Sequence, residues 1–503
     1  MTRRTAVWIM LFWFCSLILG GQIFASSPTG IPVTPPAPRF TDAERQTELA
    51  RRREALARAM TDKSMLILFS AEPKLYTNDV DYPFRQENDL YYLTALKQPN
   101  ATLILSKNGA DTRTILFIPK RTPLFESWSG KMYSNEEAAK LSGVNTIVNS
   151  TELATFLAAV RDKKTFASAD GSTKTSFVPQ AVYLLLPDSI GDNTGHREYR
   201  REYEFSKDLT GYKVENASII FDDLRQIKSP YEIKLLQHAI DITTEAQMTA
   251  WLAAPKAKME YEVRAEIEYI FRKRNADFWG FPSTVGCGPN STTLHYEEAQ
   301  DPVTPGEVLL MDVGAEYDHY TADVTRTIPV SGKFTKEQTD IYRIVYEAQE
   351  AVARATRPGV TMQQLNEIAR DVIRDGLFNL GLINDKNSQQ YGLYYMHSVG
   401  HWLGMNVHDV GRNGPPMRAG MVFTNEPGIY VRANALDGLR DTPENRAFIE
   451  KVRPAFEKYK NIGVRIEDDM LVTENGVEWL TKALPRKLED IEAFMTSGRT
   501  SRN

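Results

Sequence analysis

Cysteine is almost absent from this sequence. Only Cys15 and Cys287 occur among the 503 residues, and Cys15 lies in an N-terminal segment that we expect to be removed. A mature chain with one cysteine cannot form an internal disulfide. A zinc site built from several thiolates is excluded for the same reason.

An excess of positive charge is also lacking. The formal net charge is −5, and without Arg3 and Arg4 the rest of the chain holds 58 basic and 65 acidic residues. A mildly acidic protein has no electrostatic footprint for nucleic acid, so we expect no nucleic-acid partner. The apolar share of 42% and the charged share of 25% are typical of a globular protein, and the length favours two or three domains.

Long hydrophobic runs are missing except at the N-terminus. Residues 6–19 form a short apolar region after a basic start, and Ala25 ends a plausible cleavage sequence before Ser26. We therefore predict a signal peptide over residues 1–25 and an exported protein, periplasmic or secreted, without a stable membrane partner after cleavage. An uncleaved anchor is the alternative, although the apolar region is shorter than the ~20 residues that span a bilayer.

Two common hydrolase motifs are absent as well. The sequence contains neither His-Glu-x-x-His nor Gly-x-Ser-x-Gly. The first absence excludes the helix-borne zinc site of the zincin proteases, and the second excludes the nucleophile elbow of the serine hydrolases.

The order of the predicted elements indicates two domains. Residues 26–40 are rich in proline, serine and threonine, which predicts a flexible leader. Helical and strand patterns alternate over residues 41–222 and predict an α/β domain without a recognisable ligand constellation. The charged residues 188–207 within it predict a surface loop, with His196 in solvent. A second domain, residues 223–503, contains all the clusters described next.

Two aspartates stand at the edges of strand-like runs in the second domain. The apolar run 308–311 ends at Asp312, another run begins at Asp323, and the polar residues 316–319 favour a hairpin turn between them. Two buried carboxylates facing each other across a hairpin would repel, and a cation between them is the simplest way to remove that cost. The alternative is that Asp312 caps its strand and Asp323 pairs with Arg326.

Three of the seven histidines lie close together in the sequence. His397, His401 and His408 fall in a glycine-containing segment, residues 394–411, which we expect to be rich in strand. Histidine is the commonest metal ligand and titrates near neutral pH, so this density points to a site. The alternative is that one or two of the three are core residues with satisfied hydrogen bonds.

Two further carboxylates follow in turn- and strand-like contexts. Glu426 stands between an apolar run and a Pro-Gly turn, where its position can be fixed. Near the C-terminus, Val464 and Ile466 alternate with Arg465, Glu467 and Asp469, and a period of two places Arg465 and Glu467 on one face of a strand. Each of these patterns alone is explained by a turn carboxylate or by a solvated strand face.

Together these clusters supply four carboxylates and at least one histidine. Such an oxygen-rich set suits one or two hard to borderline divalent ions, such as manganese, iron or cobalt. With two ions, bridging carboxylates can hold a hydroxide that is a nucleophile at neutral pH, while the ions polarise a carbonyl as Lewis acids.

The same motifs resemble, in order and spacing, those of the pita-bread metallopeptidases, and most closely those of the Xaa-Pro aminopeptidases (aminopeptidase P). The matching segments are Leu294-His295-Tyr296, Asp312-Val-Gly with Asp323-Val-Thr-Arg-Thr, His397-Ser-Val-Gly-His401-Trp-Leu-Gly with Val407-His408-Asp-Val-Gly, Glu426-Pro-Gly, Arg465-Ile-Glu467-Asp-Asp and, in the first domain, residues 84–94. The resemblance covers about residues 41–495. It implies an α/β (α+β) fold, with a creatinase-like N-terminal domain followed by a pita-bread catalytic domain.

The resemblance also implies a dinuclear metal site. Asp312 would bind one ion, and Asp323 and Glu467 would bridge both. His401 and Glu426 would bind the other ion, with Glu426 a candidate proton shuttle. Manganese is the most expected metal, with cobalt, iron or zinc as alternatives.

Four other residues take roles around that site by the same resemblance. His295 and His408 would bind and polarise the substrate at the scissile carbonyl. His397 would line the pocket on the proline side, and Arg465 would orient the carboxylates. Asn425 and Ser398 stand where valine and glycine are usual in the family, although no ligand position is lost.

The implied activity is a metal-dependent exopeptidase that removes the N-terminal residue from peptides with proline in second position. The bond before proline is a tertiary amide without an N–H, so peptidases that need that N–H fail on it. A prolidase that cleaves Xaa-Pro dipeptides is the first alternative, and a non-catalytic peptide-binding module is the second. The family also implies a homo-oligomer, either a dimer or a tetramer.

Overall fold

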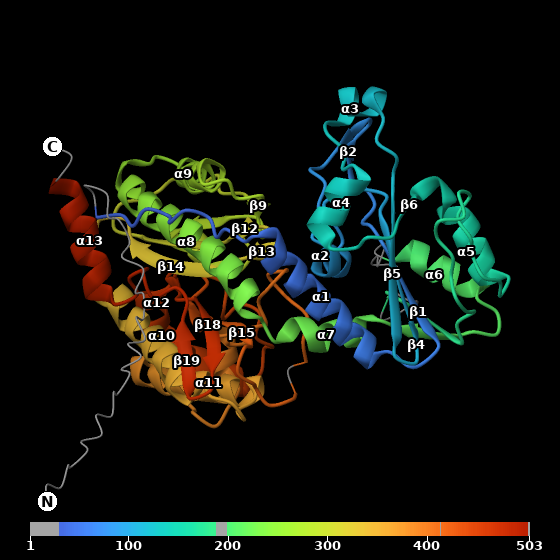
Figure 1. The fold of residues 1–503 in the computed structure, drawn as a ribbon. Coiled ribbons are helices and arrows are strands. Elements are labelled where there is room, and N and C mark those ends of the chain that lie inside the picture. Colours follow the sequence, from blue (N-terminus) through green and yellow to red (C-terminus); the bar gives the residue numbers. More distant parts are fainter. Residues whose placement is uncertain (1–29, 188–198, 413, 501–503) are drawn as a thin grey trace, which may run out of the picture.

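The computed structural model describes residues 30–187, 199–412 and 414–500, and the statements below concern this part of the chain. The predicted signal peptide, Cys15 and His196 lie outside it. Figure 1 shows two lobes connected through α7 (Ser218–Gln226), which leads into α8 (Pro230–Ala253). No helix among the described residues combines the length and the apolar character needed to cross a bilayer.

The N-terminal lobe is built on a six-stranded mixed sheet in the order β6-β5-β4-β1-β7-β8. Its central strand β1 is apolar and fully buried, and successive side chains such as Leu66 and Ile67 enter separate cores on the two faces of the sheet. The strands are β1 (Ser64–Phe69), β4 (Thr102–Asn108), β5 (Asp111–Ile118), β6 (Ile147–Asn149), β7 (Ala181–Leu184) and β8 (Lys213–Asn216). The helices are α1 (Asp42–Ala59), α2 (Asn88–Thr94), α3 (Pro123–Ser129), α4 (Asn135–Ser142), α5 (Leu153–Arg161) and α6 (Arg200–Asp208).

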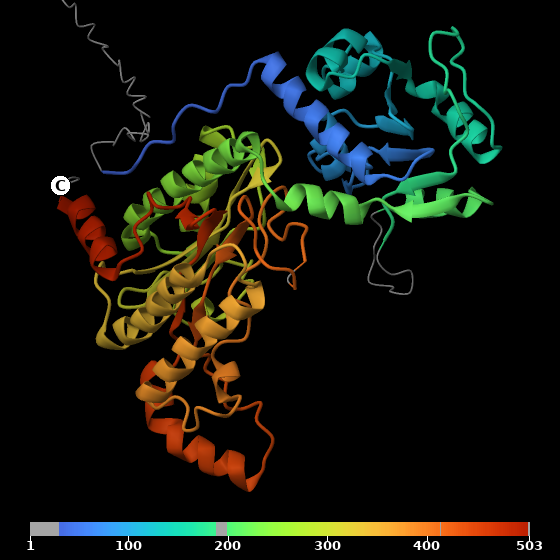
Figure 2. The same ribbon diagram turned by 60° about the horizontal axis from the view of Figure 1, so that its bottom comes forward.

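In the second lobe, helices cover a set of short antiparallel sheets. Figures 1 and 2 show α8 with α9 and α10 with α11 as two layers around these strands. The sheets have the orders β10-β11-β14, β13-β12-β9, β15-β18-β19 and β16-β17. The helices after α8 are α9 (Glu260–Lys273), α10 (Lys336–Ala355), α11 (Met362–Leu380), α12 (Pro443–Tyr459) and α13 (Leu488–Thr500).

The strands of this lobe are short, and five of them contain a predicted site residue or lie next to one in the sequence. They are β9 (Phe278–Trp279), β10 (Thr284–Cys287), β11 (Val308–Val313), β12 (Ala315–Tyr317), β13 (Tyr320–Thr321), β14 (Val324–Pro329), β15 (Val422–Asn425), β16 (Gly428–Tyr430), β17 (Gly463–Arg465), β18 (Asp468–Thr473) and β19 (Gly476–Trp479). The mixed α/β architecture of both lobes agrees with the fold class expected from the sequence.

Two local predictions are wrong. The charged segment 188–207 is not all loop, because its second half begins α6, where Arg201 lies over the Phe69 ring at 4.3 Å and Glu202 is buried. The segment 394–411 is not rich in strand, because only Trp402 forms a bridge, to Phe423. Only glycine fits at position 400, because a Cβ there would lie 1.8 Å from the main-chain oxygen of Thr424.

The end of the predicted leader is packed rather than free. Ile31 is buried in the main core of the second lobe. The backbone N–H of Thr34 donates to Glu245 on α8 at 2.8 Å, and its hydroxyl donates to the same carboxylate at 2.5 Å. The proline-rich composition predicted flexibility, but these two anchors hold residues 31–34 against α8.

Candidate metal centre

The predicted hairpin between the two aspartates is present. Strands β11 and β14 pair antiparallel, with Asp312 opposite Thr325, and β12 pairs with β13 beyond them. The turn falls at Asp318 and His319, whose φ angles of 50° and 70° are typical of a tight hairpin turn. Both aspartates therefore lie at the base of the hairpin, one on each arm.

The alternative reading of these aspartates is wrong. Arg326 does not pair with Asp323; its Nη2 donates to Asp468 at 2.6 Å, and its Nη1 donates to the Glu467 carbonyl at 2.6 Å. Asp312 does not serve as a simple strand cap, because its carboxylate pairs with Arg465. Asp323 is left facing other acidic groups.

Three of the predicted ligands meet at one point. Ligand atoms of Asp323, His401 and Glu467 all lie within 4.8 Å of one another. The His401 Nε2 is 3.3 Å from an Asp323 oxygen and 3.4 Å from a Glu426 oxygen. With Asp312, these residues come from four separate chain segments and line one cleft of about 250 Å³.

The donor set fits divalent metal ions. Burial, and next the nearby Glu467 carboxylate, raise the pKa of Asp323 well above its ordinary value. Burial, and next Glu426, do the same for the pKa of Glu467. The Asp312 Oδ1 atom is buried without a hydrogen-bond partner. A cation would neutralise the carboxylates that repel one another. It could also bind the Asp312 oxygen, which has a free lone pair.

Arg465 fixes the geometry of the acidic cluster. Its guanidinium is buried, donates to the Thr325 hydroxyl at 2.9 Å and to the Tyr430 hydroxyl at 2.8 Å, and pairs with Asp312. The Thr325 hydroxyl in turn donates to Glu467 at 2.6 Å. This one cation therefore pairs with Asp312 and approaches Glu467 both through the Thr325 hydroxyl and directly, at 3.9 Å.

His397 is coupled to this network rather than exposed in the cleft. Its Nδ1 bonds the Ser398 carbonyl at 2.7 Å, so Nδ1 carries the proton, and Nε2 accepts from the Tyr430 hydroxyl at 2.8 Å. Burial lowers the pKa of His397, which favours this neutral form. The ring lies 3.8 Å from Glu426 but is not among the residues that line the cleft, which differs from the predicted lining role.

The remaining two histidines lie at the cleft itself. His408 packs edge-on against His401, with ring centroids 4.4 Å apart, and burial lowers its pKa. His295 is exposed and lines the same cleft. The cleft is lined by Phe281, Pro282, Thr284, Leu294, His295, Glu297, Asp312, Asp323, His401, Val407, His408, Glu426, Arg465 and Glu467.

Several supporting residues were not given a role from the sequence. Tyr430 connects Arg465 to His397, and Thr424 connects the backbone N–H of His401 to Glu426, at 3.1 and 3.2 Å. Asp469 accepts from the Asp323 backbone N–H at 3.1 Å. Only Asp469 carried a usable signal, the period-two alternation that it shares with Glu467; hydroxyl side chains have no distinctive pattern.

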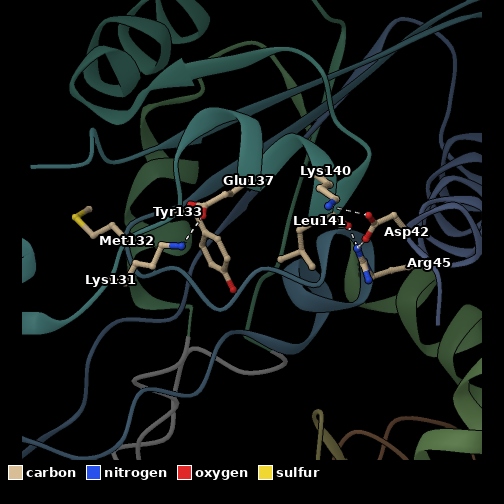
Figure 3. Close-up of a pocket in the computed structure, with 8 residues that line it drawn as sticks. All are labelled: Asp42, Arg45, Lys131, Met132, Tyr133, Glu137, Lys140 and Leu141. Carbon is tan, nitrogen blue, oxygen red and sulfur yellow. Dashed lines mark hydrogen bonds and ion pairs between the residues drawn. The ribbon is translucent and has the colours of Figure 1, made fainter. Parts of the chain in front are cut away.

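A second cavity, of about 430 Å³, lies in the N-terminal lobe between α1 and α4 (Figure 3). Its charged groups are paired with one another: Asp42 with Arg45 and with Lys140, and Lys131 with Glu137. The charged groups of this cavity therefore neutralise one another.

Comparisons with known proteins find relatives that match most of the chain. A family model described as metallopeptidase family M24 matches residues 234–474, and one described as aminopeptidase P, N-terminal domain, matches residues 49–167. The Xaa-Pro aminopeptidase of Haemophilus influenzae is 34% identical over 89% of this chain and 97% of its own length. That of Escherichia coli is 30% identical over 90% and 98%. The solved low-pH form of aminopeptidase P from E. coli superposes with a TM-score of 0.77 at 29% identity, covering 92% of this chain and all of that one.

Metal should stabilise the protein more as the pH rises. The raised pKa values of Asp323 and Glu467 favour the metal-free fold below the ordinary carboxyl range of about 4, and this contribution is lost as the pH rises through the raised values. Bound manganese reverses that loss. The gain in melting temperature on adding manganese should therefore grow as the pH rises above the ordinary carboxyl range. A gain independent of pH would contradict the charge argument.

Replacing Asp323 by alanine should remove manganese without unfolding the protein. The side chain faces His401 and Glu467 and makes no ion pair with an arginine or lysine among the described residues. We expect metal affinity to fall about 100-fold or more, measured by metal content after dialysis, while the circular dichroism spectrum is kept. Asp111→Ala, which removes only an exposed pair with Arg113, is the control. Full metal occupancy in Asp323→Ala protein would exclude this site.

Proposed function

The chain belongs to metallopeptidase family M24, among its Xaa-Pro aminopeptidases, and is a metal-dependent exopeptidase; from this premise we propose that it removes the first residue from peptides whose second residue is proline. One observation carries the proposal. Four carboxylates and a histidine converge at the base of a cleft whose walls hold two more histidines and several apolar side chains.

Two divalent ions would be held by the residues predicted from the sequence. Asp312 would bind one ion, Asp323 and Glu467 would bridge both, and His401 with Glu426 would complete the second. Manganese is the metal we propose first, because the donors are mostly carboxylate oxygens. Such ions would supply Lewis acidity. They would also lower the pKa of a water molecule, which could then lose a proton and attack a carbonyl near neutral pH.

Glu426 is placed to move a proton. One of its oxygens accepts from the Thr424 hydroxyl at 3.2 Å, and the other lies 3.8 Å from His397. We propose that this carboxylate takes the proton from the attacking water and returns it to the departing proline nitrogen. A tertiary amide nitrogen needs that proton, because it leaves as a secondary amine.

His295 and His408 would hold the scissile carbonyl from the two walls of the cleft. The lowered pKa of His408 keeps its imidazole neutral at neutral pH. A neutral imidazole retains one N–H, which can donate to a carbonyl oxygen as negative charge develops there. Phe281, Pro282 and Val407 supply apolar wall against which a proline ring can pack.

The mature enzyme is proposed to act outside the cytoplasm. This rests on the N-terminal sequence alone, whose cleavage before Ser26 would release the protein into the periplasm or the medium. The first described contacts, those of Ile31 and Thr34 with the catalytic lobe, begin only five residues after that position.

Two substrates test the activity. The manganese-loaded protein, residues 26–503, should release the first residue from an Xaa-Pro-Yaa-Zaa peptide and cleave the Xaa-Pro dipeptide at least about tenfold more slowly, followed by mass spectrometry. A chelator should stop both reactions. The reverse preference would identify a prolidase. The absence of metal-dependent cleavage of either would favour a peptide-binding module, despite the complete ligand set.

We also propose that the enzyme is a homo-oligomer that associates through its N-terminal lobe. Large apolar side chains are exposed on the hairpin β2 (Leu75–Thr77) and β3 (Val80–Asp81) and on α3, which lie at the same end of this lobe (Figure 1). Trp128 is 86% exposed and Leu124 is 76% exposed. Patches of this kind on a soluble protein mark contact surfaces.

The double variant Leu124→Ser/Trp128→Ser tests this surface. It should shift the protein from a dimer or tetramer to a monomer, measured by light scattering after size exclusion. The exposed Tyr269→Ser on α9, in the catalytic lobe, is the control and should leave the mass unchanged. An oligomer of unaltered mass in the double variant would place the interface elsewhere.

A further inference from the structure

One arginine of the N-terminal lobe bonds two segments of the catalytic lobe. The Arg85 Nε donates to both carboxylate oxygens of Glu316, at 3.0 and 2.8 Å. Its Nη2 donates to the Met405 carbonyl at 2.6 Å. Its Nη1 donates to Asn88 at 2.8 Å, which holds the guanidinium in place.

The two segments that Arg85 joins carry predicted metal ligands. Glu316 is on β12, within the hairpin whose base holds Asp312 and Asp323. Met405 lies in the loop between His401 and His408. A single guanidinium therefore fixes the hairpin and the histidine loop relative to each other.

Neighbouring residues of the same lobe reinforce this contact. The Asn88 side chain donates to Asn406 at 2.9 Å, next to Met405 in the histidine loop.

A cluster of ion pairs holds the far end of the histidine loop. Asp89 pairs with Arg225 at 2.7 Å, and Arg225 pairs with Asp409 at 2.5 Å, directly after His408. The Lys228 ammonium is 3.2 Å from the other Asp409 oxygen. Two cations and two carboxylates, all buried, thus anchor the far end of the loop.

Burial of Glu316 makes this pair sensitive to the loss of Arg85. The Glu316 side chain is 8% exposed and the Arg85 side chain is 36% exposed, and the arginine donates the hydrogen bonds that the Glu316 carboxylate accepts. Removing Arg85 would leave the buried Glu316 carboxylate without its charge partner, which is more costly than losing a pair exposed on both sides. The hairpin end would then have to move toward solvent or take up a proton.

We propose that Arg85 is a positioning residue of the metal centre. By holding Glu316 and Met405, it sets the distance between the aspartates of the hairpin and the histidines of the loop. The inference rests on the proposed function for its catalytic consequence, but its effect on metal binding does not depend on the substrate. The N-terminal lobe is then part of the active site's framework.

The test compares Arg85→Met with Lys97→Met in the mature chain, residues 26–503. Lys97 also belongs to the N-terminal lobe, contacts the hairpin through Asp318 at 3.4 Å and is 38% exposed, close to the 36% of Arg85, but no described contact joins it to the histidine loop. Metal affinity is measured by calorimetry with manganese alone, and kcat and KM are measured with an Xaa-Pro-Yaa peptide.

Arg85→Met should weaken manganese binding about tenfold and lower kcat/KM about 10- to 100-fold, mainly through kcat. Lys97→Met should stay within about twofold of the parent in both. Equal behaviour of the two variants would overturn the proposal. So would an Arg85→Met protein that is less heat-stable but binds manganese within about twofold of the parent, because the arginine would then act on stability alone.

Two milder variants cover the case in which Arg85→Met does not fold. Arg85→Lys keeps the charge, but one ammonium cannot span both partners, so it should fall between the parent and Arg85→Met. Glu316→Gln is isosteric, removes the charge attraction and should weaken manganese binding about tenfold. Parent-like affinity in both would overturn the proposal. If the parent cleaves no Xaa-Pro peptide, the proposed function fails, and the affinity measurements still decide the role of Arg85.

Discussion

Four carboxylates from separate chain segments share one small space, and their mutual repulsion is the constraint around which the catalytic lobe is built. A buried carboxylate without a partner costs several kcal/mol or takes up a proton. Arg465 supplies one positive charge to the cluster, through Asp312 and, by way of Thr325, Glu467. The remaining charge has no protein cation within the described cleft. A metal ion would therefore relieve the repulsion within this lobe as well as supply the chemistry of the site.

Two buried glutamines hold the backbone at this cluster without adding charge. From α8, the Gln247 amide donates to the carbonyls of Met311 and Val324, at 3.1 and 3.0 Å. From α10, the Gln349 amide donates to the carbonyls of Asn425 and Ile466, at 3.1 Å each. Every one of these four residues is next in sequence to a predicted carboxylate ligand. The helix layers thus fix the ligand-bearing backbone directly, which explains why a neutral side chain with two N–H donors is buried at each position.

The sequence predicted the parts of the site that depend on local pattern. Asp312 and Asp323 were placed on a hairpin because two strand-like runs and the polar bend between them are local features, and the structure has that hairpin. The irregular path of residues 394–411 was missed because close backbone contacts, such as that of Gly400, leave no periodic signal. The relay from Arg465 through Tyr430 to His397 was missed because hydrogen bonds between distant segments have no signature in one sequence.

The contacts of Arg85 between the two lobes were also beyond the reach of sequence patterns. Its two partners lie 231 and 320 residues away, so neither a motif nor a domain boundary could have indicated them. Glu316 is buried, yet the cation that neutralises it comes from the other lobe. A catalytic lobe folded alone would have to expose this carboxylate or protonate it, and either change would loosen the hairpin that carries Asp312 and Asp323. The predicted domain boundary therefore does not separate the site from the N-terminal lobe, because Arg85 of that lobe contacts the segments that carry the predicted ligands.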